Sequence, residues 1–71
     1  MEIHAPFAGT IRYHVAVGDT VGTGDHLATI EAAKLEASVN APGPGVVTDV
    51  DRGDFTDVGG GDRILTLGER K

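Results

Sequence analysis

The segment Ala5-Pro6-Phe7-Ala8-Gly9-Thr10-Ile11 returns 36 residues later, in similar form, as Ala41-Pro42-Gly43-Pro44-Gly45-Val46-Val47. Two further blocks repeat in the same order. Gly18-Asp19 matches Gly53-Asp54 at an offset of 35, and residues 24–30 match residues 61–67 at an offset of 37. The drift in these offsets predicts one residue lost after the first block and two gained near Gly59-Gly60. Three blocks in one order indicate an internal duplication.

The duplication predicts the architecture. Half-repeats of about residues 3–31 and 39–67 are each too short to bury a hydrophobic face alone, so we expect them to pack on each other about a pseudo-two-fold axis. A length of 71 residues predicts a single domain over residues 1–71. Eleven glycines and three prolines favour many turns between short segments. The predicted fold class is all-β.

Alternation of apolar and polar residues predicts individual strands. The first is expected over residues 10–17, with its odd-numbered side chains, up to Val17, on the buried face. A second is expected over residues 35–40, with Leu35, Ala37 and Val39 on one face. Residues 46–50 and 64–67 supply two more. The repeat also pairs core positions, Ile11 with Val47 and Leu27 with Ile64.

One segment is ambiguous. Residues 30–37 consist mainly of good helix formers, so propensity alone favours a helix. Eight residues are too few for a stable isolated helix, however. The segment also lies at the junction between the two halves, where a hairpin is the shortest connection. We therefore expect a hairpin, with a helix as the alternative.

Charge and composition exclude several classes of function. Six basic and eleven acidic side chains give a net charge of −5, which repels phosphate backbones and argues against nucleic acid. The sequence shows neither a signal peptide nor an apolar run long enough for a membrane helix, so we expect a cytoplasmic protein without a membrane partner. Cysteine is absent, which excludes disulfides and thiolate metal sites.

Other candidate sites carry little weight. His4, His14 and His26 are separated by 10 and 12 residues, which matches no usual zinc spacing, so no metal site is expected. An acidic run with Asp49 and Asp57 at its ends lacks the framework of a calcium loop and is expected to form solvated turns.

Lys34 stands at the junction of the halves. The only other lysine is Lys71, the last residue. Small and apolar neighbours leave the Lys34 ammonium open to approach. From the residues alone, a surface lysine weakly paired with Glu31 or Glu36 is the favoured interpretation. In either case we expect Lys34 to lie at the end of the molecule opposite the two termini.

The chain resembles biotinyl/lipoyl carrier domains over essentially its whole length. The resemblance lies in Ala5-Pro6-x-x-Gly9, in Gly18-Asp19-x-Val21-x-x-Gly24-Asp25-x-Leu27 and in Glu31-Ala32-Ala33-Lys34-Leu35-Glu36, with the first two repeated in the second half. It implies a flattened barrel-sandwich hybrid of two four-stranded antiparallel sheets with pseudo-two-fold symmetry. It also implies that Lys34, at the tip of the central hairpin, accepts the cofactor.

The residues around Lys34 bear on which cofactor the resemblance implies. Biotin carriers typically read Glu-Ala-Met-Lys-Met, and this chain matches at Glu31 and Ala32, has a bulky apolar Leu35 after the lysine, and departs at Ala33. Lipoyl domains typically have an acidic residue before the lysine and a small one after it. The resemblance therefore implies covalent biotin, with lipoate or an unmodified interaction module as alternatives. Glu31, Ala32, Ala33, Leu35 and Glu36 are the expected flanking recognition residues.

The resemblance further implies a function without catalytic residues. In such carriers a biotin protein ligase attaches the cofactor, a biotin carboxylase loads it with a carboxyl group, and a carboxyltransferase unloads it. The chain is thus expected to be a non-catalytic swinging-arm component of a multi-component carboxylase, of the small type without a protruding thumb. We expect it to be monomeric in isolation and a free-standing small protein.

Overall fold

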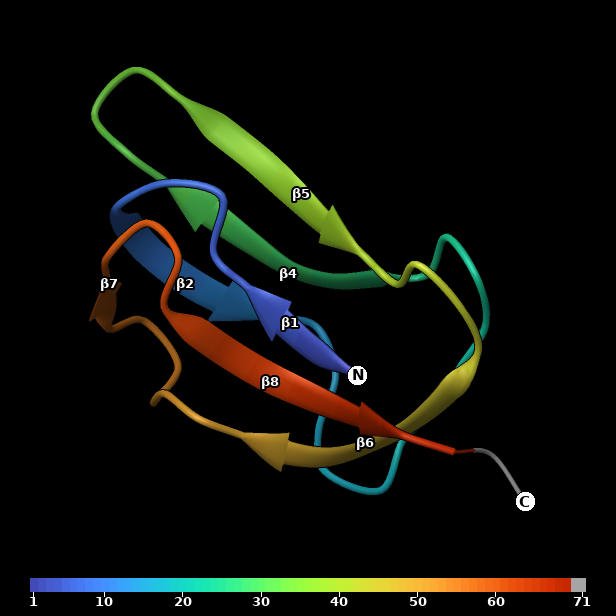
Figure 1. Ribbon diagram of the computed structural model, residues 1–71. Coiled ribbons are helices and arrows are strands. Elements are labelled where there is room, and N and C mark those ends of the chain that lie inside the picture. The colour runs from blue at the N-terminus through green and yellow to red at the C-terminus, as the bar shows by residue number, and fades with distance from the viewer. Residues whose placement is uncertain (70–71) are drawn as a thin grey trace.

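Eight short β-strands make up the computed structural model, which describes residues 1–69 (Figure 1). They are β1 (Glu2–His4), β2 (Gly9–Tyr13), β3 (Thr20–Val21), β4 (His26–Glu31), β5 (Glu36–Asn40), β6 (Gly45–Val50), β7 (Asp57–Val58) and β8 (Arg63–Gly68). Residues 1–69 contain no helix, and hence none of a length and apolarity that would cross a membrane.

The strands form two four-stranded antiparallel sheets, in the orders β1-β8-β6-β3 and β5-β4-β2-β7. Neither sheet closes into a barrel. Replacing each strand by the one four places earlier or later in the chain converts the first order into the second. This symmetry confirms the predicted flattened barrel-sandwich with a pseudo-two-fold axis.

Two equivalent turns show how closely the halves correspond. The Gly22 N–H donates to Asp25 Oδ2 at 2.7 Å, and the Gly59 N–H donates to Asp62 Oδ2 at 2.7 Å. The glycine before each aspartate has φ of 86° or 87°, a left-handed conformation that glycine adopts without a steric penalty. Each aspartate side chain thus closes a turn that the preceding left-handed glycine makes possible.

The halves align differently from the sequence comparison around Gly18. The Gly18 N–H donates to Val47 O at 2.8 Å, and the Phe55 N–H donates to Ile11 O at 2.8 Å. Because Ile11 and Val47 are equivalent, the counterpart of Gly18 is Phe55. The predicted pairing of Gly18-Asp19 with Gly53-Asp54 is therefore wrong. Gly-Asp is a common turn dipeptide, and the two copies share their residue types but not their position in the hydrogen-bond network.

The extra residue of the second half is Thr48, at a bulge within β6. Val47 pairs with Leu67 and Asp49 with Thr66, whereas their counterparts Ile11 and Arg12 are adjacent and pair with Ile30 and Thr29. From β3 and β7 onward the two halves keep a constant offset of 37, as the starts of these strands at Thr20 and Asp57 show. The insertion predicted near Gly59-Gly60 is wrong, because Gly59 is the direct counterpart of Gly22.

One hydrophobic core fills the space between the sheets. Its buried members are Ile3, Ala5, Ile11, Val21, Leu27, Ala28, Ile30, Ala41, Val47, Val58, Ile64, Leu65 and Leu67. Ile11 and Val47 are 0% and 1% exposed, and Leu27 and Ile64 are both 0% exposed. The predicted pairs of equivalent core positions are confirmed.

Two expected strand positions are wrong. β2 ends at Tyr13, and Val17 is 61% exposed, because the chain must leave this sheet to reach β3, which pairs with β6 in the other one. Leu35 is 62% exposed because it precedes β5 and lies beyond the edge of the core. Ala37 and Val39, within β5, are half-buried as expected.

Two equivalent glycines are predicted to be indispensable to the packing. A Cβ at Gly9 would lie 2.5 Å from Glu31 O, and one at Gly45 would lie 2.7 Å from Gly68 O. Gly9→Ala and Gly45→Ala should each lower the free energy of unfolding by about 1–3 kcal/mol, because backbone would have to move. Thermal unfolding measures the effect, with Gly22→Ala as the matched control, since its Cβ would meet nothing closer than 3.8 Å. Equal unfolding temperatures in the three variants would contradict the prediction.

Candidate functional site

The junction between the halves is a hairpin, as predicted. Residues 32–35 connect β4 to β5, and the Ala32 N–H donates to Leu35 O at 2.8 Å. Glu31 and Glu36 face each other as the last cross-strand pair below the turn. Ala33 and Lys34 therefore occupy the tip, and the helical alternative is wrong because β-pairing holds both sides of the segment.

The hairpin rests on a buried strand. β4 lies between β2 and β5 in its sheet, and its four central residues, 27–30, are all buried. The burial stops at Glu31, which is exposed. A tip carried by such a strand is held in position by the core although it lies outside the core itself.

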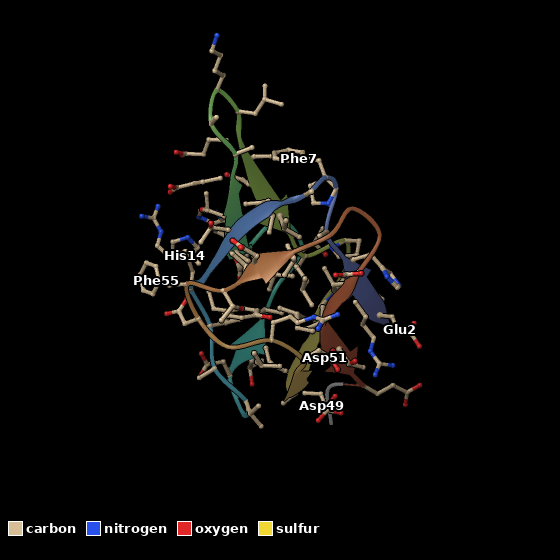
Figure 2. The ribbon with its side chains drawn as sticks, turned by 90° about the vertical axis from the view of Figure 1, so that its left-hand side faces the viewer. Glu2, Phe7, His14, Asp49, Asp51 and Phe55 are labelled. Atoms are coloured by element: carbon tan, nitrogen blue, oxygen red, sulfur yellow. The ribbon has the colours of Figure 1, made fainter. Side chains whose placement is uncertain are left out.

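The tip projects at one end of an elongated molecule. The described chain measures 39 × 20 × 17 Å along its principal axes. The β4–β5 connection forms one extreme, at the upper left of Figure 1 and at the top of Figure 2, and β8 ends on the far side. Lys34 thus lies away from the start of β1 and the end of β8, as predicted.

Lys34 is exposed and electrostatically unengaged. Among residues 1–69, no carboxylate lies within ion-pair distance of its amine. Glu31, one of its expected partners, instead pairs with Arg12, at 3.5 Å between Oε1 and Nη2. An exposed primary amine without a competing carboxylate can be acylated, and the site therefore fits a covalently attached acyl arm. Lys71 lies outside the described residues.

The expected flanking residues surround this amine without enclosing it. Glu31, Ala33, Leu35 and Glu36 are exposed, and only Ala32 is half-buried. The five side chains form an accessible surface and no cleft. An enzyme that modifies Lys34 would therefore have to supply the catalytic pocket and recognise the hairpin from outside.

The family follows from comparison with known proteins. A family model described as "Biotin-requiring enzyme", of the biotin/lipoyl type, matches residues 2–67. The chain belongs to the biotin/lipoyl carrier family. Domains of this family are carrier domains, generally non-catalytic, within carboxylases. No curated protein sequence matches the chain significantly.

Solved structures with this fold include two carboxylases. The urea carboxylase of Kluyveromyces lactis is 29% identical, with a TM-score of 0.85 over 96% of this chain and 6% of that one. A single-chain, multi-domain long-chain acyl-CoA carboxylase is 25% identical, with a TM-score of 0.90 over 100% of this chain and 7% of that one. An aspartoacylase family protein from Mesorhizobium loti shares the fold, at 17% identity and a TM-score of 0.82 over 93% of this chain and 22% of that one. The chain thus spans only a small part of the length of these three solved proteins.

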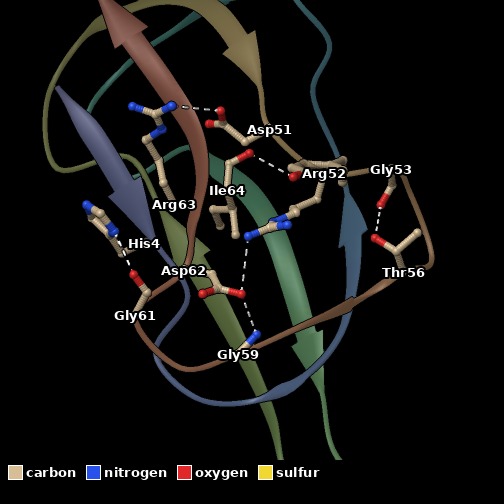
Figure 3. A network of polar contacts seen from close by, with 11 residues as sticks. His4, Asp51, Arg52, Gly53, Thr56, Gly59, Gly61, Asp62, Arg63 and Ile64 are labelled. Atoms are coloured by element: carbon tan, nitrogen blue, oxygen red, sulfur yellow. Dashed lines mark hydrogen bonds and ion pairs between the residues drawn. The ribbon is translucent and has the colours of Figure 1, made fainter.

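The acidic run on the second half is partly engaged in ion pairs (Figure 3). Asp51 Oδ1 lies 3.2 Å from Arg63 Nη2, and Asp62 Oδ2 lies 3.4 Å from Arg52 Nη2. The Asp51 N–H also donates to Ile64 O at 2.8 Å. These contacts hold the loop after β6 against β8. The acidic run therefore forms solvated turns, as expected, and also stabilises the fold.

Sequence reasoning missed a pair of histidines. His14 and His26 stack with ring centroids 4.1 Å apart, and their Nε2 atoms lie 2.9 Å and 3.2 Å from the same Thr29 hydroxyl. A hydroxyl has one proton, so it can donate to at most one of the two rings, and any other bond to it is one that it accepts from a ring N–H. Knowledge of the β2–β4 register would have revealed the pair. His4 lies apart on β1, and residues 1–69 hold no group of three side chains suited to a metal ion.

The environment of this pair lowers the pKa of His14. Partial desolvation of the ring, which remains largely exposed, is the first cause, followed by the nearby His26 and Arg12, while Asp54 acts in the opposite direction. The folded protein therefore binds this proton less readily than the unfolded chain. Its contribution to stability is present above the ordinary histidine pKa of 6.5 and is lost as the pH falls through the lower folded pKa.

We predict that the pKa of His14 depends on its stacked neighbour. In His26→Gln the pKa of His14, followed by NMR through its ring resonances, should move upward toward the ordinary value, because one positive neighbour is removed. His4→Gln is the matched control and should leave the pKa of His14 in place, since His4 lies in the other sheet. An unchanged pKa of His14 in His26→Gln would show that the stacking has no electrostatic effect.

Proposed function

We propose that this chain is a biotin carboxyl carrier, with biotin held as an amide on Lys34. The observation that carries the proposal is the placement of Lys34, an exposed amine without an ion-pair partner among residues 1–69, at the tip of a hairpin rooted in buried β4. The family membership and the likeness to two carboxylases support it.

The protein contributes reach and position. When bound, biotin supplies the ring nitrogen that accepts and releases a carboxyl group. Lys34 provides the amine that anchors it, and amide formation removes the charge of that amine. Because β4 fixes the base of the hairpin, the arm samples a limited volume around the tip. Tethering of this kind gives effective concentrations on the order of millimolar at a partner active site.

The residues beside Lys34 support biotin over lipoate. Glu31 and Ala32 agree with the biotin-type pattern, and Leu35 is bulky and apolar where lipoyl domains have a small residue. Leu35 is also 62% exposed, so its side chain is available to a modifying enzyme. A biotin protein ligase would read this surface of the hairpin, with the exposed carboxylate of Glu36 at its margin.

The remaining parts of the proposal concern partners and location. A biotin carboxylase would load the arm and a carboxyltransferase would unload it, with the chain acting as a monomeric, non-catalytic component in the cytoplasm. A lipoyl carrier is the alternative, because Ala33 departs from the biotin-type methionine. An unmodified interaction module is a further alternative, favoured by the occurrence of this fold in an aspartoacylase family protein.

Lys34 is predicted to be the sole acceptor. After coexpression with a biotin ligase, intact mass should show one biotin per chain, and Lys34→Arg should abolish it because the arginine guanidinium is not acylated. Lys71→Arg is the matched control and should keep full labelling. The fold of Lys34→Arg should be intact, since the tip is exposed. A lipoyl mass, or no modification of the wild type, would favour the respective alternative, and labelling of Lys34→Arg would refute the assignment.

The departure at Ala33 predicts a gain of function. Ala33→Met should increase the initial rate of biotinylation at fixed ligase, by about two- to tenfold, through added apolar contact with the ligase. Its exposed position should make the substitution neutral for stability. Ala37→Met, on β5 and away from the tip, serves as the control for added apolar surface. A slower rate in Ala33→Met would mean that the modifying enzyme requires a small residue before Lys34.

A further inference from the structure

Phe55 combines two unfavourable features. Its φ is 60°, and it is the only residue other than glycine with positive φ among residues 1–69. A bulky side chain in this left-handed region is an outlier, because its Cβ crowds the neighbouring carbonyl. Its ring is also 68% exposed, more than any other large hydrophobic side chain of the described chain. Packing of the ring against the core therefore contributes little stability to offset this strain.

The internal duplication shows that the fold does not need this ring. Gly18 occupies the equivalent position in the first half, with φ of 98°. Both residues donate their N–H to the equivalent strand carbonyl, Gly18 to Val47 and Phe55 to Ile11, each at 2.8 Å. The position requires left-handed backbone and one N–H, and glycine provides both. Backbone strain at such a site points to a role outside folding.

A groove between two loops adjoins the chain at the residue before Phe55. The groove has a volume of about 550 Å³ and lies between the β2–β3 loop and the β6–β7 loop. Its apolar wall comes from Val15, Val17 and Val50, and Asp54, which precedes Phe55, lies on its rim. Phe55 and His14 point from the same flank in Figure 2. Exposed Val17 and Phe55 thus add apolar surface to one side of the molecule.

The charge around the groove is negative. Asp19 and Asp54 line it, and Asp57 follows Phe55 by two residues. Their carboxylates accept hydrogen bonds from uncharged donors, the N–H groups of Ala16 and Tyr13 and the hydroxyl of Thr10. Within residues 1–69 none of the three forms an ion pair.

The one cation of this rim is already engaged. Arg52 also lines the groove, but its guanidinium pairs with Asp62 at 3.4 Å. The whole chain carries a net charge of −5. A surface that fits this flank must therefore be cationic around an apolar recess large enough for an aromatic ring.

We propose that Phe55 and the adjoining groove dock the carrier onto the biotin carboxylase that loads Lys34. This inference rests on the proposed function. The carboxylase meets the carrier in every cycle, whereas a ligase meets it once, so a repeated gain in docking can offset a lasting cost in stability. The carboxyltransferase also meets the carrier in every cycle, and an effect of Phe55→Gly on the KM of that enzyme and not on the KM of the carboxylase would overturn the proposal. The ring is an aromatic anchor, and the carboxylates steer the carrier toward a cationic surface.

The placement of the two sites is compatible with simultaneous contact. Phe55 lies on the flank, below the level of the hairpin in Figure 2, and Lys34 sits at the tip of that hairpin. The tip can therefore enter a recessed active site while the flank contacts its rim. Docking of the flank would confine the motion of the arm on Lys34 to the active site of the docked partner.

The first test separates strain from structural need. Phe55→Gly should leave the unfolding temperature unchanged or raise it by up to about 5 °C, because left-handed strain is relieved and little packing is lost. Phe55→Asn, which tolerates the same backbone, should behave alike. A fall of more than about 5 °C in both variants would show that the ring serves the fold, and would overturn the proposal.

The second test measures docking with the biotin carboxylase of the same organism. With biotinylated carrier as the substrate, Phe55→Gly should raise KM about tenfold, and Phe55→Tyr, which keeps a ring and the strain, should stay near the wild-type value. The wild-type KM should rise with salt, as expected for charge steering. Equal KM values for wild type and Phe55→Gly would overturn the proposal.

A third measurement does not depend on the cofactor. In NMR titrations of unmodified, isotope-labelled carrier with the carboxylase, amides of residues 14–19 and 51–57 should broaden first in the wild type and not in Phe55→Gly. Broadening confined to the hairpin would refute the docking site and leave the proposed function intact. Intact mass of Lys34 tests that function separately, so the two failures are distinguishable.

Discussion

Each sheet of this protein takes two strands from each half of the chain, and this interleaving is the constraint on which the rest depends. β1 and β3 pair with β8 and β6, and β5 and β7 pair with β4 and β2. Neither half can satisfy its backbone hydrogen bonds or cover its apolar face alone. The core between the sheets forms only when both halves are in register. The two turns of each half and the glycines at the close contacts are therefore compatible with this one arrangement of the strands.

The same constraint explains why a symmetric fold carries one asymmetric site. The pair β4–β5 corresponds to the pair β8–β1, but only β4 and β5 are joined by a short turn. That turn is the covalent junction of the halves, and it bears Lys34. Because β4 is the more deeply buried partner, a rigid strand delivers the amine to the end of the molecule. A carrier needs this combination of a fixed base and an accessible tip, since cofactor chemistry takes place in other active sites.

Departures from the internal symmetry gather on one flank. Phe55 stands where the first half has Gly18, and the stacked His14 and His26 have as counterparts Asp51 and Arg63, which form an ion pair at 3.2 Å. Positions that serve the core, such as Ile11 and Val47, keep their apolar character in both halves. Duplication thus provides an internal reference, because whatever both halves retain is needed by the fold, and whatever only one half has requires another explanation.

The amino-acid sequence was enough to predict the all-β class, the duplication, the equivalent core pairs and the hairpin that carries Lys34. These follow from local alternation and from repeated turn residues, which are properties of neighbours in the chain. It misplaced the partner of Gly18, extended β2 to Val17 and buried Leu35. The packing of the two sheets sets these positions, and it also sets the His14–His26 contact and the exposure of the Phe55 ring. The reason is physical. Where a strand leaves its sheet, and which backbone groups meet across it, depends on residues tens of positions away, whose register no local pattern encodes.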